Sequence, residues 1–478
     1  MGLGKYQVNL AHAFLQLDND RLGTYNLWDC HATAKLALAL EAELTRTHNR
    51  SFYYDDLLPL QSAVLAMQHR GLLLDRDAKA SYRRRLRAEL RDVDTYLGSV
   101  APSEGFSPNS DTQVSRWIFG ALGTGGLGLR PAKHTPTGRA SVDQESLTRV
   151  LRDLRKMDEH ARPILEALFH RSRLQTIDER YLDMEPGPDS KIRARVKMYG
   201  TKTYRFSYSE PALQQMPPEC RHFFVADPGS QFIHVDYSQL EARLLAHLAH
   251  DDASIAVFLA GGDVHLANAS DLLGVAKDQV DKGARNFAKT FLYGISYGGA
   301  AETMKTKTYC PCPRCRDKVP PTLELTRARI REAEDRWFAR HPAVRRFQRD
   351  TAELVRRNHY YDHPFGVRRY FSKPWGPELD RELKNLPMQM GGAILMIRAQ
   401  NRLHALGAPI VLQMHDAFML EVPEVEVDYW AKEVRGVMEE SVPQLGGVSL
   451  PVDVSIGCNW GDYSDENTGG LRVVAAGP

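Results

Sequence analysis

The sequence predicts an α+β fold in which one central sheet carries two helical lobes. Short apolar runs with β character lie at residues 192–200, 231–238 and 409–422. A long, mostly helical middle, residues 240–358, separates the second run from the third. Strands this far apart in sequence must meet in space to form one sheet, which indicates an α+β rather than an alternating βαβ arrangement.

Composition sets outer limits on the class of protein. The 478 residues suggest about three domains or one multi-lobed enzyme. There is no apolar run of membrane-spanning length and no secretory signal pattern at the start. Three of the six cysteines crowd into one short stretch, unlike a secreted disulfide framework, so we expect a reducing cytoplasm. A net charge of +2 neither favours nor excludes a nucleic-acid partner.

The first part of the chain reads as three helices and a loop. Apolar residues at helical spacing predict helices over 27–50 and 56–71, the second closed by Gly71. A strongly charged helix is predicted from Asp77 to about Tyr96, as suits a solvent-exposed arm. The glycine-rich segment 120–141 is more typical of a flexible loop than of a nucleotide-binding turn, and no P-loop motif follows it.

Two aspartates stand where the predicted strands end. Asp236 closes the strand of FIHVDYSQLEARLLAHLA, just before a predicted helix, and would alone read as a helix N-cap. His415 and Asp416 in PIVLQMHDAFMLEV separate two apolar runs, which predicts a hairpin with both residues at its tip. Alone, Asp416 could be a turn residue. Together the two acids suggest carboxylates converging on two Mg²⁺ ions, the arrangement that serves phosphoryl transfer.

A third segment, RNFAKTFLYGISYG, supplies cations and an aromatic ring. Arg285, Lys289 and Tyr293 are four residues apart, so they share one face of a helix. Two cations on that face suit a triphosphate, and the ring one turn on could stack on a base or sugar. Taken alone, the segment could equally be a surface helix with a buried tyrosine.

These segments, in this order, resemble the three polymerase motifs of family A DNA polymerases, the group that contains bacterial DNA polymerase I and many phage replicases. DYSQLEAR is similar to the first motif, R-x3-K-x3-Y-G-x2-Y-G to the fingers-helix motif, and HD to the third. Further matches are FSPNSDTQVSRWIFGALG, TYRFSYSEPALQQMP, GDVHLANAS, FGVRRY and NLPMQMGGAILMI. The resemblance covers nearly the whole chain from about residue 55.

The resemblance implies a right-hand polymerase with a palm sheet and helical fingers and thumb, binding primer–template DNA and dNTPs. Asp236 and Asp416 would be catalytic and hold two Mg²⁺, with the carbonyl of Tyr237 as a further ligand. Lys289 would also be catalytic, protonating the departing pyrophosphate. The implied nucleotide-binding residues are Arg285, Lys289, Tyr293, Tyr297, His265, Glu241 and Gln239. The implied DNA-binding residues are Arg205, Gln214, Asn385, Gln389, His415 and Arg173.

Three of these positions carry more specific expectations. Glu241 resembles the steric gate that denies room to a ribose 2′-hydroxyl, so deoxynucleotides are expected. Tyr293 resembles the tyrosine of phage-type members, which implies weak discrimination against dideoxynucleotides. Tyr297 would stack near the templating base and swing as the fingers close.

The predicted domains follow the same resemblance. They are an exonuclease-domain remnant or N-terminal extension at 1–54, palm entry at 55–74, thumb at 75–175, palm at 176–250, fingers at 251–379 and palm at 380–478. No insertion in the thumb suggests a thioredoxin-like factor, and a monomer is expected. The earlier carboxylate motifs of a proofreading exonuclease are absent, so this chain is not expected to proofread.

Three features depart from the family pattern. Ala417 stands where the third motif usually has glutamate, and we still expect activity, since two acids suffice for two metals. Tyr25 and Asp29 read either as the end of an exonuclease domain or as a chance pair on a helix. The run Cys310, Cys312 and Cys315 reads either as part of a structural Zn²⁺ site, with Cys220, Cys458 or His341 as a fourth ligand, or as a reduced surface loop.

Two other functions are alternatives to a DNA polymerase. A single-subunit RNA polymerase would lack the DYSQxE gate that Glu241 supplies. A catalytically impaired, polymerase-like protein that only binds primer–template would fit the loss of an acid at Ala417. Such a scaffold has no need of Asp236, Asp416 or the two cations near them. Reverse transcription as a side activity stays open.

Overall fold

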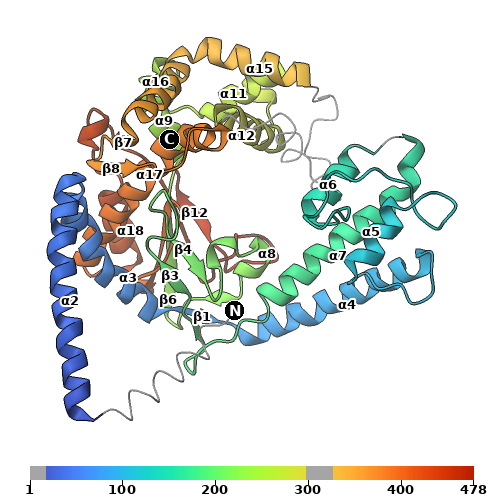
Figure 1. Ribbon diagram of the computed structural model, residues 1–478, viewed down its shortest axis with the longest axis horizontal. Coiled ribbons are helices and arrows are strands. Elements are labelled where there is room, and N and C mark those ends of the chain that lie inside the picture. Colours follow the sequence, from blue (N-terminus) through green and yellow to red (C-terminus); the bar gives the residue numbers. More distant parts are fainter. Residues whose placement is uncertain (1–17, 155, 298–326, 478) are drawn as a thin grey trace.

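The computed structural model describes residues 18–154, 156–297 and 327–477. It confirms the α+β prediction, because the distant strand segments meet in one five-stranded antiparallel sheet of order β12-β11-β6-β10-β9 (Figure 1). The strands are β6 Ser230–Tyr237, β9 Ile410–Met414, β10 Ala417–Pro423, β11 Val452–Gly457 and β12 Arg472–Ala475.

The two faces of this central sheet have different surroundings. Alternate residues of β6 point to opposite faces, so Ile233, Val235 and Tyr237 share one face and lie fully inside the core. Helix α18, Val427–Met438, packs on that side, where the Tyr237 hydroxyl donates to the carbonyl of Met438 at 2.8 Å. Asp236 therefore points to the other face of the sheet.

Smaller strands and two long helices complete this central region. The strands pair as β2-β1-β5, β3-β4 and β7-β8, with bounds β1 Leu72–Leu74, β2 Lys191–Ile192, β3 Arg195–Lys197, β4 Ser207–Ser209, β5 Phe224–Val225, β7 Tyr360–His363 and β8 Val367–Tyr370. Helices α3, Leu58–Arg70, and α17, Pro377–Ala405, lie against each other. As predicted, α3 ends at Gly71, whose φ of 64° is readily adopted by glycine.

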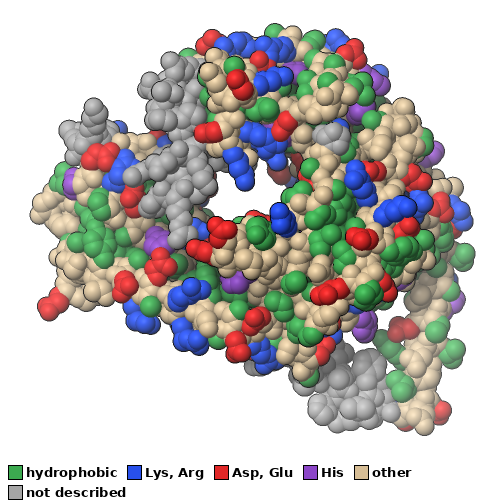
Figure 2. Space-filling view, turned by 180° about the vertical axis from the view of Figure 1, so that it is seen from behind, with side chains coloured by type: hydrophobic (Ala, Val, Ile, Leu, Met, Phe, Trp, Pro, Cys, Tyr) green, Lys and Arg blue, Asp and Glu red, His purple; other side chains and the backbone are tan. Residues whose placement is uncertain are grey.

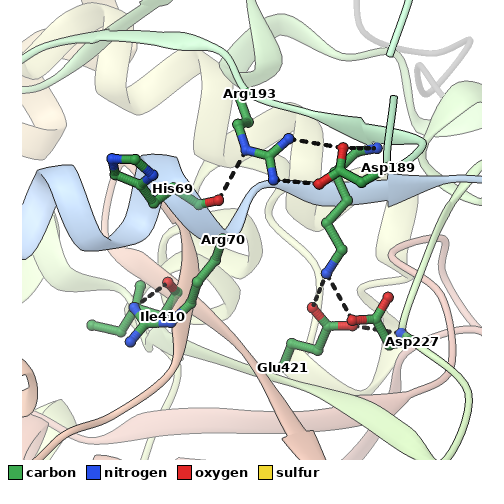
Figure 3. Close-up of polar contacts among 8 residues, drawn as sticks. His69, Arg70, Asp189, Arg193, Asp227, Ile410 and Glu421 are labelled. Carbon is green, nitrogen blue, oxygen red and sulfur yellow. Dashed lines mark hydrogen bonds and ion pairs between the residues drawn. The ribbon is translucent and has the colours of Figure 1, made fainter. Parts of the chain in front are cut away.

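Polar contacts attach the small β2-β1-β5 sheet and α3 to the central sheet (Figure 3). Lys191 on β2 reaches Asp227 at 2.7 Å and Glu421 of β10 at 3.7 Å. At the end of α3, the Arg70 guanidinium donates to the carbonyl of Ile410 on β9 at 3.3 Å. The Arg70–Ile410 contact joins residues 340 apart in the sequence, so it attaches the end of α3 to β9 of the central sheet.

The first helical lobe has a core of its own. It comprises α4 Arg76–Val100, α5 Asp111–Phe119, α6 Gln144–Arg152 and α7 Arg162–Arg180, and it projects from the sheet in Figure 1. Leu97, Trp117, Leu151 and Leu165 belong to a hydrophobic cluster separate from the main core. The glycine-rich segment 120–141 is a loop between α5 and α6, as predicted.

The second helical lobe lies above the sheet, at the top of Figure 1, whereas the first lobe lies at the right of that view. Its described helices are α10 Asp252–Leu259, α11 Val264–Leu273, α12 Lys282–Ser296, α15 Arg327–Arg340 and α16 Pro342–Asn358, which follow α8 Pro218–Arg221 and α9 Leu240–Ala249. Figure 2 shows a hollow through the middle of the molecule, with Lys and Arg side chains at its edge.

The predicted N-terminal helix is present as α2, Asn19–Arg46. Tyr25 and Asp29 lie one turn apart on it, and none of its side chains is buried in the described structure. A turn of π-helix, Phe52–Leu57, joins this region to α3. None of the described helices is long and apolar enough to cross a membrane.

Candidate active site

Asp236 and Asp416 come together at one edge of the central sheet. Asp236 is near the end of β6, and Asp416 lies in the turn between β9 and β10, as the hairpin prediction requires. The pairing places Ala417 directly across from Asp236, and the Tyr237 amide donates to the carbonyl of Asp416 at 3.2 Å. The N-cap reading of Asp236 is wrong, because α9 begins at Leu240 and its cap residue is Gln239.

Both carboxyl groups are held where negative charge is unfavourable. Burial, followed by repulsion from Asp416 and Asp453, raises the pKa of Asp236, and burial likewise raises the pKa of Asp416. Oδ1 of Asp236 is buried without a hydrogen-bond partner in the described structure. A divalent cation would satisfy this oxygen and remove the repulsion, so the two residues fit a metal-binding role.

The protein alone does not complete a metal site in the part of the chain that the structure describes. No group of three or more His, Cys, Asp or Glu side chains there is arranged to hold an ion. Mg²⁺ binds through one or two carboxylates together with waters and substrate phosphates, and the two carboxylates of Asp236 and Asp416 fit that ligand preference.

Helix α12 presents the predicted cationic face. The sequence analysis did not identify Asp263, which forms an ion pair with this face. The Arg285 guanidinium pairs with Asp263 at 2.6 Å, and Asp263 also caps α11 by accepting from the His265 and Leu266 amides. Lys289, one turn along, is exposed. Asp263 could have been noticed as an N-cap in GDVHLANAS, but nothing in that pattern indicates its contact with Arg285.

His265 lies beside this face as an uncharged group. Burial, followed by the nearby charge of Lys289, lowers its pKa to about 4. Its Nε2 is 3.5 Å from the Tyr293 hydroxyl, and the two rings are 5.2 Å apart. A neutral imidazole can donate one hydrogen bond to a phosphate oxygen without adding a charge to the site.

Tyr293, Tyr297 and Glu241 form a connected row between α12 and α9. The two tyrosine rings stack with centroids 5.5 Å apart. The Tyr297 hydroxyl donates to Oε2 of Glu241 at 3.0 Å, and Arg205 donates to Oε1 at 2.5 Å. The structure therefore brings three residues expected to bind nucleotide, Tyr293, Tyr297 and Glu241, together in one row. It adds Arg205, which was expected to bind DNA.

The predicted primer–template residues are less uniform in their surroundings. Arg205 and His415 line one small cavity. The amides of Gln214 and Asn385 donate instead to nearby backbone carbonyls, at 2.9 and 3.1 Å, while Gln389 is partly buried on α17. Arg173 lies apart on α7, where it pairs with Glu219 of α8 at 2.5 Å.

The candidate zinc ligands Cys310, Cys312 and Cys315 lie outside the described residues. Of the suggested fourth ligands, Cys220 is fully buried, Cys458 is exposed, and Nδ1 of His341 lies 2.7 Å from Oδ2 of Asp251.

Sequence reasoning also missed Asp453. This residue lies on β11 directly across from Asp236, on the side away from Ala417. Directly opposed residues on neighbouring strands share a face of the sheet, so Asp453 is a third acid beside the pair. The alternation in VDVSIG predicts a strand, but not which strand it joins.

Fold and site together define a right-hand polymerase, with an acidic pair on an antiparallel sheet, a basic and aromatic helix facing it, and helical lobes on either side. Residues 76–462 match the family model for DNA polymerase family A. The chain belongs to this family.

Known proteins similar to the chain include bacterial polymerases and one of their solved structures. The chain is 30% identical to DNA polymerase I of Chloroflexus aurantiacus, over 97% of this chain and 48% of that protein. It is 31% identical to the thermostable DNA polymerase I of Thermus aquaticus, over 84% and 47%. The POL domain of Pol1 from M. smegmatis, solved in complex with DNA primer-template and dNTP, has a TM-score of 0.78 and 25% identity, covering 95% of this chain and 78% of that one. The chain thus spans about half the length of the first two relatives.

Proposed function

We propose that this chain is a DNA-directed DNA polymerase that extends a primer 3′ end with dNTPs by two-metal nucleotidyl transfer. The observation that carries the proposal is the meeting of Asp236 and Asp416 at one edge of the sheet, with a basic helix face nearby. The M. smegmatis neighbour, solved with primer-template and dNTP, supports the choice of substrates. Tyr293 is the feature that favours a phage-type enzyme.

The domain assignment belongs to the same proposal. The central sheet would be the palm, the lobe of α4 to α7 the thumb, and the lobe of α10 to α16 the fingers. The separate core of the first lobe and its projection from the sheet support its assignment as the thumb. Primer–template would occupy the hollow seen in Figure 2, whose edge carries Lys and Arg side chains.

Asp236 and Asp416 would hold two Mg²⁺ ions, aided by the carbonyl of Tyr237. When bound, such ions lower the pKa of the primer hydroxyl and neutralise charge on the phosphates. The residual task of the protein is to position the triphosphate. Arg285 must exchange its contact with Asp263 for a phosphate, and Lys289 would donate a proton to the departing pyrophosphate.

Glu241 would select deoxynucleotides by occupying the space that a 2′-hydroxyl requires. Its carboxylate is held by Arg205 and Tyr297, so the side chain cannot easily move aside. Arg205, Gln214, Asn385, Gln389, His415 and Arg173 would contact primer–template. Those in the minor groove would read little sequence, because its acceptors are nearly shared by all base pairs. We expect no proofreading from this chain.

The test is primer extension with the purified chain, Mg²⁺ and four dNTPs, beside an Asp416→Ala control. Templated extension that the control loses is the expected result. Failure of the wild type in both Mg²⁺ and Mn²⁺, with retained primer–template binding, would favour the catalytically impaired alternative. Ala417 would then be the first position to restore to glutamate.

A further inference from the structure

A large groove in the second helical lobe lies outside the site described above. It has a volume of about 830 Å³ and runs between α15, α16, the segment 371–376 and the start of α17. None of its lining residues belongs to the acidic pair or to the α12 face. Figure 2 shows Lys and Arg side chains gathered along the nearby edge of the molecule, over α15.

Cations form a stripe along one wall of this groove. Arg345, Arg349 and Arg356 recur at spacings of four and seven residues, so they lie on one face of α16. The eleven residue steps from Arg345 to Arg356 span about 17 Å at about 1.5 Å per residue. A stripe of this length suits a chain of phosphates better than one isolated phosphate. The groove also contains Arg357 and Lys384.

Carboxylates neutralise only part of this charge. The groove contains Glu334, Glu353 and Asp380. Ion pairs engage Arg345 with Asp335, Arg349 with Asp350, and Lys384 with Asp380, at 3.8, 2.9 and 2.9 Å. In the described part of the chain, Arg356 and Arg357 have no ion-pair partner. Both guanidinium groups are exposed at one end of the groove, and no described carboxylate neutralises their charge.

An aromatic ring stands at the same end. Trp375 is 37% exposed, and the Arg356 guanidinium lies 4.2 Å from its ring centroid. A stacking surface beside a basic track is the combination by which proteins bind single-stranded nucleic acid without sequence preference. A duplex would not use the ring, because its bases are already stacked and paired.

We propose that this groove binds single-stranded DNA, with an unpaired base on Trp375 and phosphates on Arg356 and Arg357. The inference rests on the proposed polymerase function for the source of the strand. Helix α17 carries both Lys384 of the groove and Asn385, one of the residues expected to contact primer–template. The strand is therefore either unpaired template ahead of the primer end or a strand displaced from it.

Affinity measured against overhang length tests the proposal without requiring catalysis. Fluorescence anisotropy without divalent ions would compare primer–templates with template overhangs of about 2 and about 15 nucleotides. The wild type should bind the longer overhang more tightly. Trp375→Ala should lose that gain, by about 5- to 100-fold from the loss of one stacked base, and Trp375→Phe should recover most of it. Binding to the short overhang should not change.

Arg356→Ala/Arg357→Ala tests the phosphate contacts. The log–log salt slope for the long overhang should fall by about 1.4, since each phosphate contact on a single strand contributes about 0.7. Arg336→Ala/Arg346→Ala is the matched control, because it removes two exposed arginines of α15 and α16 that do not line the groove. Equal slopes for the two double variants would overturn the proposal.

Photocrosslinking with 5-iododeoxyuridine separates the two sources of the strand. The label would be placed in the template overhang in one substrate and in a 5′ flap of a downstream strand in the other. A crosslink at Trp375 from either substrate supports the groove and identifies its strand, and its absence from both overturns the proposal. Primer extension on the short-overhang substrate reports separately on the polymerase function, so the two failures are distinguishable.

Discussion

The hydroxyl of Tyr297 donates a 3.0 Å hydrogen bond to Oε2 of Glu241, which joins the residue that follows α12 to helix α9. The other carboxylate oxygen, Oε1, accepts from Arg205 at 2.5 Å. The side chain expected to exclude a ribose hydroxyl is thus fixed from both sides. Its selectivity should depend on its neighbours as well as on its own size.

Tyr297→Phe should weaken selection against ribonucleotides. A hydrogen bond to a charged group contributes about 1.5 to 3 kcal/mol, so the ratio of kcat/KM for dATP over rATP should fall by about tenfold or more. The ratio is the proper readout, because Tyr297 is also expected to stack near the template. Glu241→Ala should have the larger effect, and adding Tyr297→Phe to it should change nothing further. Additive effects would mean that Tyr297 acts independently of Glu241.

Tyr293→Phe should make the enzyme discriminate more strongly against dideoxynucleotides. The Tyr293 hydroxyl is 3.5 Å from the His265 ring, at the side of α12 expected to face the nucleotide. If this hydroxyl substitutes for the missing 3′-hydroxyl of a dideoxynucleotide, its loss should cost about tenfold in relative incorporation. Competitive incorporation of ddTTP and dTTP gives the ratio. A variant that terminates as readily as the wild type would contradict the prediction.

Asp416→Asn should abolish extension and yet stabilise the metal-free protein. Asp236 has a pKa raised by burial and then by Asp416, so the folded state binds a proton more tightly than the unfolded state. Its contribution to the free energy of unfolding therefore falls as pH rises from about 4 through the raised pKa. The asparagine removes one of the repelling charges and should reduce this fall.

Thermal unfolding in EDTA at pH 5 and pH 8 measures the effect. At pH 8 the variant should exceed the wild type by about 1 kcal/mol or more, since one pKa unit corresponds to about 1.4 kcal/mol. Mg²⁺ should raise the wild-type Tm more than that of the variant. An equal loss of stability with pH in both proteins would show that the two carboxylates do not repel each other in the folded state.

The active-site core could be predicted from sequence because its signals are local. A strand that ends in Asp236, a hairpin tip at Asp416 and a four-residue repeat from Arg285 to Tyr293 each follow from period and turn chemistry alone. Considered alone, Asp236 was wrongly interpreted as an N-cap, since a polar residue just before a helix is usually its cap. The structure decided between the two readings, because α9 begins at Leu240 and its cap residue is Gln239.

What could not be predicted depends on contacts between distant segments. The ion pair of Arg285 with Asp263 depends on how α11 packs on α12, and no spacing rule connects residues 22 apart. Asp453 became a neighbour of Asp236 only through the strand order of the sheet. The apolar spacing of residues 27–50 predicts a helix but not its surroundings, and in the described structure none of the α2 side chains is buried.

Asp251→Asn should destabilise the second helical lobe at neutral pH. Asp251 precedes α10 and His341 precedes α16; both are buried, and His341 Nδ1 lies 2.7 Å from Oδ2 of Asp251. An ionised carboxylate can only accept, so His341 must donate. Burial opposes the charge on Asp251, but hydrogen bonds from His341 and Ser254 outweigh it and lower its pKa. Losing one partner of such a buried pair costs about 3 kcal/mol.

The pH dependence identifies the charge on Asp251 as the cause. A lowered pKa in the folded state stabilises the protein above about pH 4, the value in the unfolded chain, and this contribution disappears as pH falls through the lowered value. Urea unfolding should therefore show a constant difference between wild type and Asp251→Asn from pH 5 to 8, and a shrinking one below pH 4. Asp252→Asn is the matched control, because its neighbouring carboxylate is exposed and should show little difference at any pH. A difference between wild type and Asp251→Asn that persists unchanged at pH 3 would mean that shape, rather than charge, holds the two helices together.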